Sequence, residues 1–223
     1  MKKIATIHTD LKTKFGVPRQ AGLVPGLTGR IVFEPEYRSL DAVRGLEDFS
    51  HIWLIWEFSE NIREGFSPTV RPPRLGGNER LGVFATRSPF RPNPIGLSCV
   101  ELLRVETDSP DAPALIVSGA DMMDGTPIYD IKPYLPYADS RPGVRGGFTD
   151  SSQFHTLDVE LPPELGELLP PEKAQALISL LSQDPRPQYH NDPGRVYGFE
   201  FAGFEIKFTV SGSTATVVEI SPE

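Results

Sequence analysis

Short apolar segments separated by turns dominate the first 120 residues of the chain. Residues Ile4 to His8 alternate apolar and polar positions, as a half-buried strand does. Residues Phe49 to Phe58 are almost continuously apolar and aromatic, which predicts a central strand buried on both faces. Similar patterns predict strands over 28–34, 81–85, 97–105 and 114–119. Strands at this spacing, without long helices between them, favour an antiparallel sheet or barrel.

Two segments rich in proline and glycine interrupt this pattern. The first covers residues 12–29, where Pro18 precedes the polar pair Arg19 and Gln20. The second covers residues 124–140 and carries acidic, basic and tyrosine side chains. Because proline fixes φ and glycine permits positive φ, both segments are interpreted as loops with a specified backbone and a functional role.

The pattern changes after residue 150. A single convincing helix begins at Pro171 and ends before Pro185, and three short strands follow over 195–201, 204–210 and 214–220. We therefore expect a mainly β protein with an antiparallel β-barrel domain over 1–150 and a small α+β subdomain over 155–223. Proline and glycine together make up about a fifth of the 223 residues, which also favours turns and short strands over long helices.

Composition excludes several classes of protein. Cys99 is the only cysteine, so neither an intramolecular disulfide nor a cysteine-based zinc site is possible. The N-terminus lacks the apolar segment of a signal peptide, and no stretch is apolar enough to predict a membrane span. We expect a soluble, cytoplasmic protein without a membrane partner.

Positive charge is concentrated between Thr69 and Ser98. This stretch has five arginines against one glutamate, although the whole chain carries a net charge of −8. Charge placed in this way implies an anionic partner. Prolines flank Arg87 and Arg91, which favours a recognition role for their guanidinium groups, although surface arginines that tie a loop to nearby acids remain the alternative.

Common catalytic and metal-binding signatures are missing from the chain. There is no HExxH, CxxC or GxSxG motif and no phosphate-binding glycine motif. Four aspartates lie between Asp121 and Asp139, but their spacing does not match a calcium-binding loop, so no metal is predicted. His51, Trp53 and Trp56 are expected in the core, although the two tryptophans could instead form a platform on which bases stack.

Three long strings then identify a family. The stretch from Thr69 to Ser98, together with KFGVPRQAGL (14–23) before it and DGTPIYDIKPYLPYAD (124–139) after it, closely resembles the TsaA-like family, whose bacterial members are the TrmO type. DPRP (184–187) and YGF (197–199) resemble that type's small C-terminal subdomain. The resemblance covers essentially the whole chain. It implies a β-barrel homodimer that binds S-adenosylmethionine and methylates tRNA on N6 of threonylcarbamoyladenosine beside the anticodon, threonine tRNA above all.

The resemblance also implies which residues contact the cofactor. The segment PRQAG, the strand end before DGTP and the motifs ATR and IGL would line one pocket near the subunit interface. Two further residues follow the FSHIW strand, where members of the family often have histidine in place of Ser59. The implied cofactor residues are Arg19, Gln20, Ala21, Phe58, Ser59, Arg87, Leu97, Gly119, Ala120 and Asp121.

The chemistry of the reaction suggests a proton acceptor in the loop 124–140. The acceptor nitrogen bears a carbonyl group, so it is a poor nucleophile until it loses its proton. Asp130 is the first candidate for a catalytic base and Tyr134 the second. We expect four residues to contact tRNA phosphates or the threonyl carboxylate, namely Arg71, Arg74, Arg91 and Lys132.

Two other functions are compatible with the same sequence. One is a non-catalytic accessory protein that binds S-adenosylmethionine or RNA. The other is a methyltransferase for a different small substrate, because a family resemblance constrains the cofactor more than the acceptor.

Overall fold

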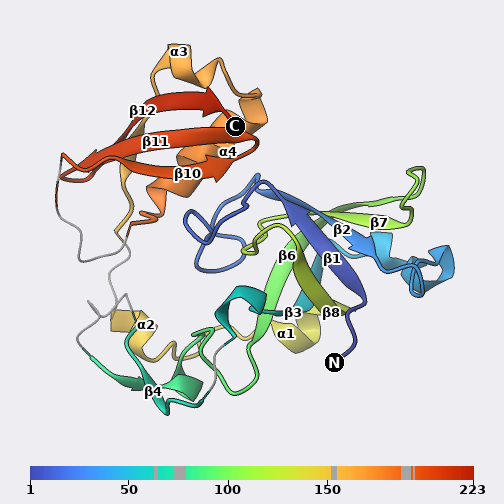
Figure 1. Ribbon diagram of the computed structural model, residues 1–223. Helices are drawn as coiled ribbons and strands as arrows, with labels where there is room; N and C mark the ends of the chain where they lie inside the picture. The colour runs from blue at the N-terminus through green and yellow to red at the C-terminus, as the bar shows by residue number, and fades with distance from the viewer. Residues whose placement is uncertain (63–64, 73–78, 152–154, 187–191, 193) are drawn as a thin grey trace.

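Six antiparallel strands close into a barrel in the computed structural model, which describes the chain except for residues 63–64, 73–78, 152–154, 187–191 and 193. Their order around the barrel is β1-β2-β7-β6-β3-β8 (Figure 1). This confirms the predicted mainly β fold. The strands are β1 (Ala5–Thr9), β2 (Thr28–Phe33), β3 (His51–Glu57), β6 (Ile95–Glu106), β7 (Ala114–Ser118) and β8 (Thr126–Pro133).

Strand β3 shows how the barrel divides its side chains. Ile52, Leu54 and Trp56 point inward and are buried, whereas the alternate positions are only half-buried. The prediction that this strand is buried on both faces is therefore wrong, because the outer face of the barrel is not covered. Trp53 lies on that outer face, and His51 is exposed at the start of the strand. The prediction that both residues belong to the core is therefore wrong.

The segment 124–140 is not a continuous loop, which corrects the second loop prediction. It contains β8 and a single helical turn, α1 (Pro136–Asp139). Pro127 lies opposite Thr6 of β1 before the pairing with β3 begins, and Pro133 lies at the other end, opposite Ile52 of β3. Both prolines thus stand where β8 has only one neighbouring strand, so neither removes a hydrogen bond from the middle of the sheet.

The segment between β3 and β6 forms an arm, which we define as residues 59–93. A hydrogen bond from Phe58 N to Pro94 O, 2.8 Å long, closes its base. The arm contains the helical turn η3 (Ser59–Asn61) and the two-residue strands β4 (Thr69–Val70) and β5 (Leu81–Gly82). A second helical turn, η5 (Val83–Ala85), follows β5, so the strand predicted over 81–85 is wrong beyond Gly82. Two other helical turns, η1 (Leu40–Val43) and η2 (Leu46–Asp48), connect β2 to β3.

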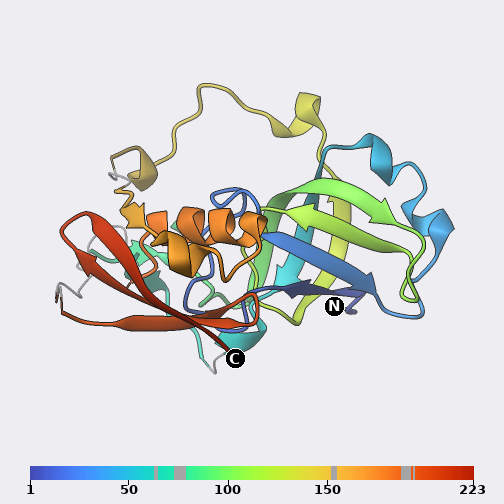
Figure 2. The ribbon, with the colours of Figure 1, turned by 90° about the horizontal axis from the view of Figure 1, so that it is seen from above.

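The C-terminal part is a four-stranded sheet with one helix against it (Figure 2). The predicted helix and three strands are confirmed as α4 (Pro171–Ser182), β10 (Tyr197–Phe201), β11 (Phe204–Ser211) and β12 (Thr214–Pro222). The sheet also includes β9 (Asp158–Glu160), which pairs parallel with β12 and was too short to detect in the sequence. Two short helices, α2 (Phe148–Ser151) and α3 (Pro163–Gly166), precede α4. No helix within the described ranges is long and apolar enough to cross a membrane.

Two hydrophobic clusters fill these two parts, and one of them draws on both. The barrel cluster is built from residues that precede β9. The C-terminal cluster combines α4 and the second sheet with Leu11, Val24 and Leu27, which come from residues 10–27 between β1 and β2. We call residues 10–27 the N-terminal loop. The domain boundary near residue 150 stays a prediction, because the N-terminal loop belongs to the first part of the chain but packs against the C-terminal part.

The N-terminal loop is shaped to fit the C-terminal sheet. Phe15 lies 5.9 Å from Phe199 and 6.3 Å from Phe208, measured between ring centroids. Gly16 has a φ of +93°, and a Cβ at this position would lie 2.9 Å from the ring of Phe199. Only glycine combines that backbone angle with so close an approach. The first turns of the loop are therefore fixed by apolar contacts with the C-terminal part.

Candidate functional site

The N-terminal loop returns to the barrel at two glycines. Gly22 N donates to Gly119 O at 2.9 Å, and Gly119 N donates to Leu27 O at 2.9 Å. Gly119 has a φ of +78°, and a Cβ there would lie 3.1 Å from the backbone of Gly22. This close approach of two backbones brings the segment before Gly22 beside the segment after Gly119. Residues 19–21 and 119–121, which the sequence assigns to one pocket, are thus neighbours.

A buried hydrogen-bond chain positions Asp121. The indole Nε1 of Trp56 donates to Ser98 Oγ at 2.9 Å, and Ser98 Oγ donates to Asp121 Oδ1 at 2.6 Å. Trp56 and Ser98 are both buried. Gly96 faces Trp56 across the strand pair, and a Cβ there would lie 2.2 Å from the indole, so glycine makes room for this ring. Sequence analysis missed Trp56 and Ser98 as site residues, although the alternation of β3 and β6 places both on the inner face.

Asp121 connects the chain of hydrogen bonds to the N-terminal loop. Burial raises the pKa of its carboxyl group, whereas the Ser98 hydroxyl, the backbone amide of Ala21 and the charge of Arg87 act in the opposite direction. Arg87 in turn donates to the side-chain oxygen of Gln20. A carboxylate, a guanidinium and an amide therefore meet where the N-terminal loop, the arm and the strand β7 come together.

The base of the arm borders the same place. The ring of Phe58 lies 4.3 Å from the ring of Trp56, between centroids, and Phe58 is only partly buried. Lys14 of the N-terminal loop donates to the carbonyl oxygen of Glu60 and, at 3.4 Å, to Asn61 Oδ1. Ser59 begins the turn that carries these two acceptors. The structure thus places Phe58 and Ser59 beside the loop that they were predicted to accompany.

Three predicted cofactor residues point elsewhere. The guanidinium of Arg19 donates to the backbone oxygen of Asp184 at 3.4 Å and so faces the C-terminal part. Ala120 is buried in the barrel core, so its side chain does not reach the surface of a pocket. Leu97 is 54% exposed and lies opposite Ile55 on the outer face of the barrel, whereas its neighbour Ser98 faces inward.

The predicted catalytic residues also lie on the outer face. Asp130 is opposite Ile55, and its carboxylate accepts from Ile131 N at 3.0 Å and lies 3.1 Å from Lys132 Nζ. Tyr134 packs its ring 6.0 Å from that of Trp53, between centroids. Lys132 therefore pairs with Asp130 within the chain. Among the described residues, no hydrogen bond joins this group to Asp121.

A second carboxylate on the outer face escaped sequence analysis. Tyr129 Oη donates to Glu57 Oε2 at 2.6 Å, and this hydrogen bond raises the pKa of Tyr129 to about 12. A bulge in the pairing of β3 with β8, between Ile55 and Trp56, places both Tyr129 and Asp130 near the partly exposed side of β3. No periodic pattern in the sequence signals a bulge, which explains why this pair was not found.

The three arginines predicted to contact tRNA differ in their surroundings. Arg71 is exposed at the end of β4. Arg91 donates from Nη1 to the backbone oxygens of Val83, at 3.2 Å, and of Thr86, at 2.7 Å, so it ties the arm together. Arg74 lies outside the described residues. In the described part of the chain, no group of three or more histidine, cysteine, aspartate or glutamate residues is arranged to hold a metal ion.

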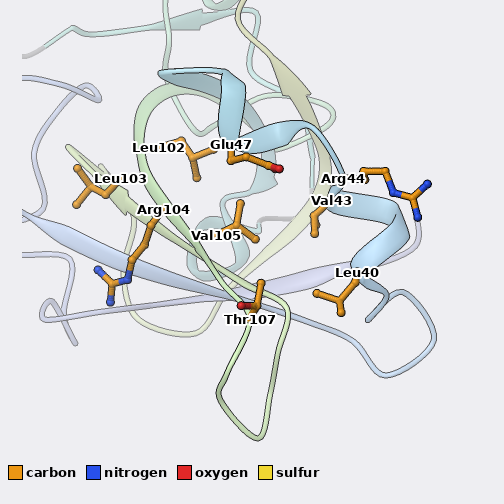
Figure 3. Close-up of a pocket in the computed structure, with 9 residues that line it drawn as sticks. All are labelled: Leu40, Val43, Arg44, Glu47, Leu102, Leu103, Arg104, Val105 and Thr107. Atoms are coloured by element: carbon orange, nitrogen blue, oxygen red, sulfur yellow. The ribbon is translucent and has the colours of Figure 1, made fainter.

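One surface cavity lies away from this cluster. It has a volume of about 520 Å³ between η1, η2 and the end of β6, and Figure 3 shows Arg44 and Arg104 on opposite sides of its apolar lining. A smaller cavity of about 200 Å³ lies between the N-terminal loop and the end of α4, and Arg19 and Asp184 both line it. We locate the candidate site at the Asp121 cluster because charged and polar groups from three segments converge there. Volume alone would favour the cavity between η1, η2 and the end of β6.

Known proteins resemble the chain over its whole length. The model of the tRNA-methyltransferase O N-terminal domain matches residues 6–140, and that of the TrmO C-terminal domain matches residues 155–223. The Escherichia coli tRNA (adenine(37)-N6)-methyltransferase is 42% identical, with 99% of this chain and 97% of that protein covered.

Two further comparisons agree with this match. A Pseudomonas aeruginosa protein whose name describes an S-adenosylmethionine-dependent methyltransferase is 41% identical, with 87% of this chain and 85% of that protein covered. The crystal structure of TrmO from Pseudomonas aeruginosa superposes with a TM-score of 0.80 at 32% identity, with 99% of this chain and 96% of that chain covered. The resemblance found in the sequence is thus confirmed, and the chain belongs to the tRNA-methyltransferase O family.

Proposed function

We propose that this chain is an enzyme that transfers the methyl group of S-adenosylmethionine to N6 of adenosine 37 in tRNA. The match to a tRNA (adenine(37)-N6)-methyltransferase over 99% of the chain supports the reaction. The observation that carries the proposal is the convergence of Gln20, Arg87 and Asp121 at one place, because these residues come from segments far apart in the sequence. Such a convergence of polar groups is typical of a ligand site.

The groups at this cluster fit the chemistry of S-adenosylmethionine. The guanidinium of Arg87 suits the carboxylate of the methionyl part, since arginine binds carboxylates with two parallel hydrogen bonds. The carboxylate of Asp121 suits ribose hydroxyl donors, and the ring of Phe58 offers a surface on which an adenine base can stack. Ala21, Ser59 and Gly119 belong to the same proposed set because they lie on the segments that meet at this cluster. The side chains of Arg19, Leu97 and Ala120 face elsewhere, so these three residues would contribute through their backbone.

The methyl group carries its own activation on sulfur, so the protein has to align the reactants and accept a proton. In the proposed reaction the bond from sulfur to the methyl carbon breaks as the bond to N6 forms. The proton of N6 passes to the carboxylate of Asp130, which Lys132 and the amide of Ile131 orient. Tyr134 is the second candidate for this role.

We propose that the substrate adenosine carries a threonylcarbamoyl group and that threonine tRNA is the preferred tRNA. A threonyl carboxylate and the RNA phosphates both require cationic partners, and Arg71 and Lys132 are exposed cations on the arm and on β8. Arg74 and Arg91 belong to the same proposed set. Binding of tRNA should therefore weaken steeply as the salt concentration rises.

We further propose that the enzyme is a cytoplasmic homodimer. Leu97 and Leu103 of β6 are exposed apolar side chains on the outside of the barrel, and a second copy of the chain would cover them. A subunit interface on this face would also bring the Asp130 group close to a cofactor pocket of the second copy, whereas no hydrogen bond or ion pair among the described residues connects it to the Asp121 cluster of its own subunit.

Mass spectrometry of tRNA nucleosides tests the proposed function directly. The enzyme is incubated with tRNA and S-adenosylmethionine that carries a labelled methyl group. We expect label in the base of adenosine 37, stronger in tRNA that already carries the threonylcarbamoyl group. Cofactor binding without any labelled nucleoside would identify a non-catalytic binding protein instead, and label in a small molecule added in place of tRNA would identify another acceptor.

The role of Asp130 is tested by Asp130→Asn, with Lys132→Gln as the matched variant. Loss of the base should lower kcat by about 100-fold or more while the affinity for S-adenosylmethionine stays unchanged. Lys132→Gln removes the partner and keeps the carboxylate, so it should cost less. Near wild-type turnover of Asp130→Asn would rule out this residue and direct attention to Tyr134.

A further inference from the structure

The arm presents an exposed pair of aromatic rings that the proposed site does not use. Phe84 is 72% exposed and Phe66 is 56% exposed, and their ring centroids lie 6.3 Å apart with the planes inclined by 26°. Burial of phenylalanine side chains stabilises a folded protein, so two rings that stay in solvent contribute little to the stability of the fold. Exposed apolar patches of this kind mark interaction sites.

The ring of Phe84 is held by its own segment. It belongs to η5, and the guanidinium carbon of Arg91 lies 5.8 Å from its ring centroid. The same guanidinium is fixed by hydrogen bonds to the backbone oxygens of Val83 and Thr86. A ring that is fixed before binding loses little conformational freedom when a ligand stacks on it. Arg91 thereby has a structural role within the arm, in addition to the tRNA contact proposed for it above.

Positive charge lies on the same arm. Val70 and Leu81 form the end pair of β4 and β5, and Arg71 follows Val70 whereas Arg80 precedes Leu81. Both arginines are exposed, and neither forms an ion pair with an acid in the described part of the chain. The two arginines flank the same end pair of the two strands, so their charges repel each other and a bound anion would stabilise this end of the arm.

An arm that carries both exposed rings and exposed arginines matches one class of ligand. Single-stranded RNA offers unstacked bases to aromatic side chains and phosphates to arginines, and stacking of this kind does not depend on the base. An acidic protein would satisfy the arginines but would not require two exposed rings side by side. Phe84 is three residues from Arg87, so their Cα atoms are at most about 11 Å apart. Bases bound here would lie close to Arg87 of the proposed cofactor site.

We propose that Phe66 and Phe84 stack on unpaired bases of the anticodon loop, while Arg71 and Arg80 bind the phosphates beside them. This surface is not part of the cofactor cluster, and the inference rests on the proposed tRNA substrate. In this proposal the arm recognises the anticodon loop, and the residues of the barrel carry out methyl transfer. Phe84 contributes as a binding residue and has no part in proton transfer.

The experiment uses a full-length tRNA with 2-aminopurine at a loop position next to adenosine 37, and its fluorescence reports stacking. The wild-type protein should quench the fluorescence. Phe84→Leu and Phe66→Leu keep an apolar side chain but lose the ring, so each should reduce the quenching and weaken binding about tenfold. Phe84→Trp should restore both. The leucine variants should keep the dependence of affinity on salt, whereas Arg71→Gln should lower its slope by about one unit.

Two outcomes would overturn the inference. The first is quenching and tRNA affinity in Phe84→Leu equal to those of the wild type. The second is a change of molecular mass in solution that accompanies the loss of quenching, because it would assign the rings to contact with a second copy of the chain. A wild-type protein that binds no tRNA at all would instead overturn the proposed function, and S-adenosylmethionine titrations on every variant show whether the cofactor site is intact.

Discussion

The two hydrophobic cores of the molecule differ in where their residues come from. The barrel encloses its own core with side chains from its strands and the turns between them. The C-terminal core is completed by Leu11, Val24 and Leu27 of the N-terminal loop. The same loop is hydrogen-bonded to the barrel through Gly22 and Gly119. The residues proposed to bind the cofactor therefore depend on both regions, although their charged groups lie at the barrel.

The largest effect is expected when the C-terminal core loses a ring that contacts the loop. Phe208 is fully buried, and its ring lies 6.3 Å from that of Phe15, between centroids. Phe208→Ala should lower the free energy of unfolding by about 3–5 kcal/mol, because transfer and cavity costs add. The remaining folded protein should bind S-adenosylmethionine more weakly, since the loop loses its support. Urea unfolding and calorimetric titration of the cofactor measure the two effects.

A barrel variant provides the comparison. Leu115 is fully buried near the start of β7, whereas Gly119 follows the end of this strand. Leu115→Ala should lower the free energy of unfolding by about 2–5 kcal/mol. Its cofactor affinity should stay close to that of the wild type at a temperature where the protein is folded. Equal losses of affinity in both variants would mean that general stability, and not the support of the loop, controls binding.

Two glycines of the N-terminal loop test its packing on the C-terminal part with smaller expected effects on stability. Gly16→Ala introduces a Cβ 2.9 Å from Phe199, whereas the Cβ of Gly26→Ala would lie 3.8 Å from Ala176, an ordinary contact. Both positions have positive φ, so each variant should lose about 1–2 kcal/mol through backbone strain. Gly16→Ala should lose about 1–3 kcal/mol more through overpacking. Thermal unfolding measures the difference, and equal stabilities would contradict tight packing of the loop on Phe199.

The link between loop and barrel is tested by Ser98→Ala. Without the Ser98 hydroxyl, the pKa of Asp121 should rise further above its usual value, because one of the groups that oppose the effect of burial is removed. Cofactor affinity should fall about tenfold, and its decline in acid should begin at higher pH. Ser118→Ala is the matched control, since Ser118 Oγ accepts from Gly26 N, at 3.4 Å, and does not contact Asp121. A pH shift of equal size in both variants would contradict the role of Ser98.

The smallest effect is expected in the stability of Asp121→Asn. Burial raises the pKa of Asp121 in the folded protein, so the folded state binds this proton more tightly than the unfolded state. Stability from this group is therefore present at low pH and is lost as the pH rises through its folded pKa. Relative to the wild type, Asp121→Asn should gain stability from acid towards neutral pH and then reach a plateau. Urea unfolding across this pH range measures the gain, and a constant difference would refute it.

The sequence predicted the parts of the fold that depend on periodicity. The alternation of Ile4 to His8 and the spacing of α4 led to the right elements, because burial of one face dictates such patterns. Strand β8 was missed because its prolines suggest a loop, and only the pairing with β1 and β3 shows that each stands where one neighbour is absent. Strand pairing depends on contacts distant in the sequence, which a local pattern does not contain.

The candidate site shows the same division. Resemblance placed Gln20, Arg87 and Asp121 in one pocket, and the structure brings these three together. It could not indicate that Trp56 and Ser98 support Asp121, because that depends on which strands are neighbours in the barrel. Nor could it indicate that Arg91 is bound to the backbone of its own arm. Charge along a sequence predicts that a cation is present but not what it contacts.

Hydrogen–deuterium exchange with and without S-adenosylmethionine tests the central claim that the N-terminal loop and the barrel hold the cofactor together. We predict slower exchange of the amides in residues 19–22 and 119–121 when the cofactor binds, and loss of this protection in Phe208→Ala. Protection confined to the cavity between residues 40–47 and 102–107 would contradict the account, because the cofactor would then bind at a place that involves neither region of the proposed site.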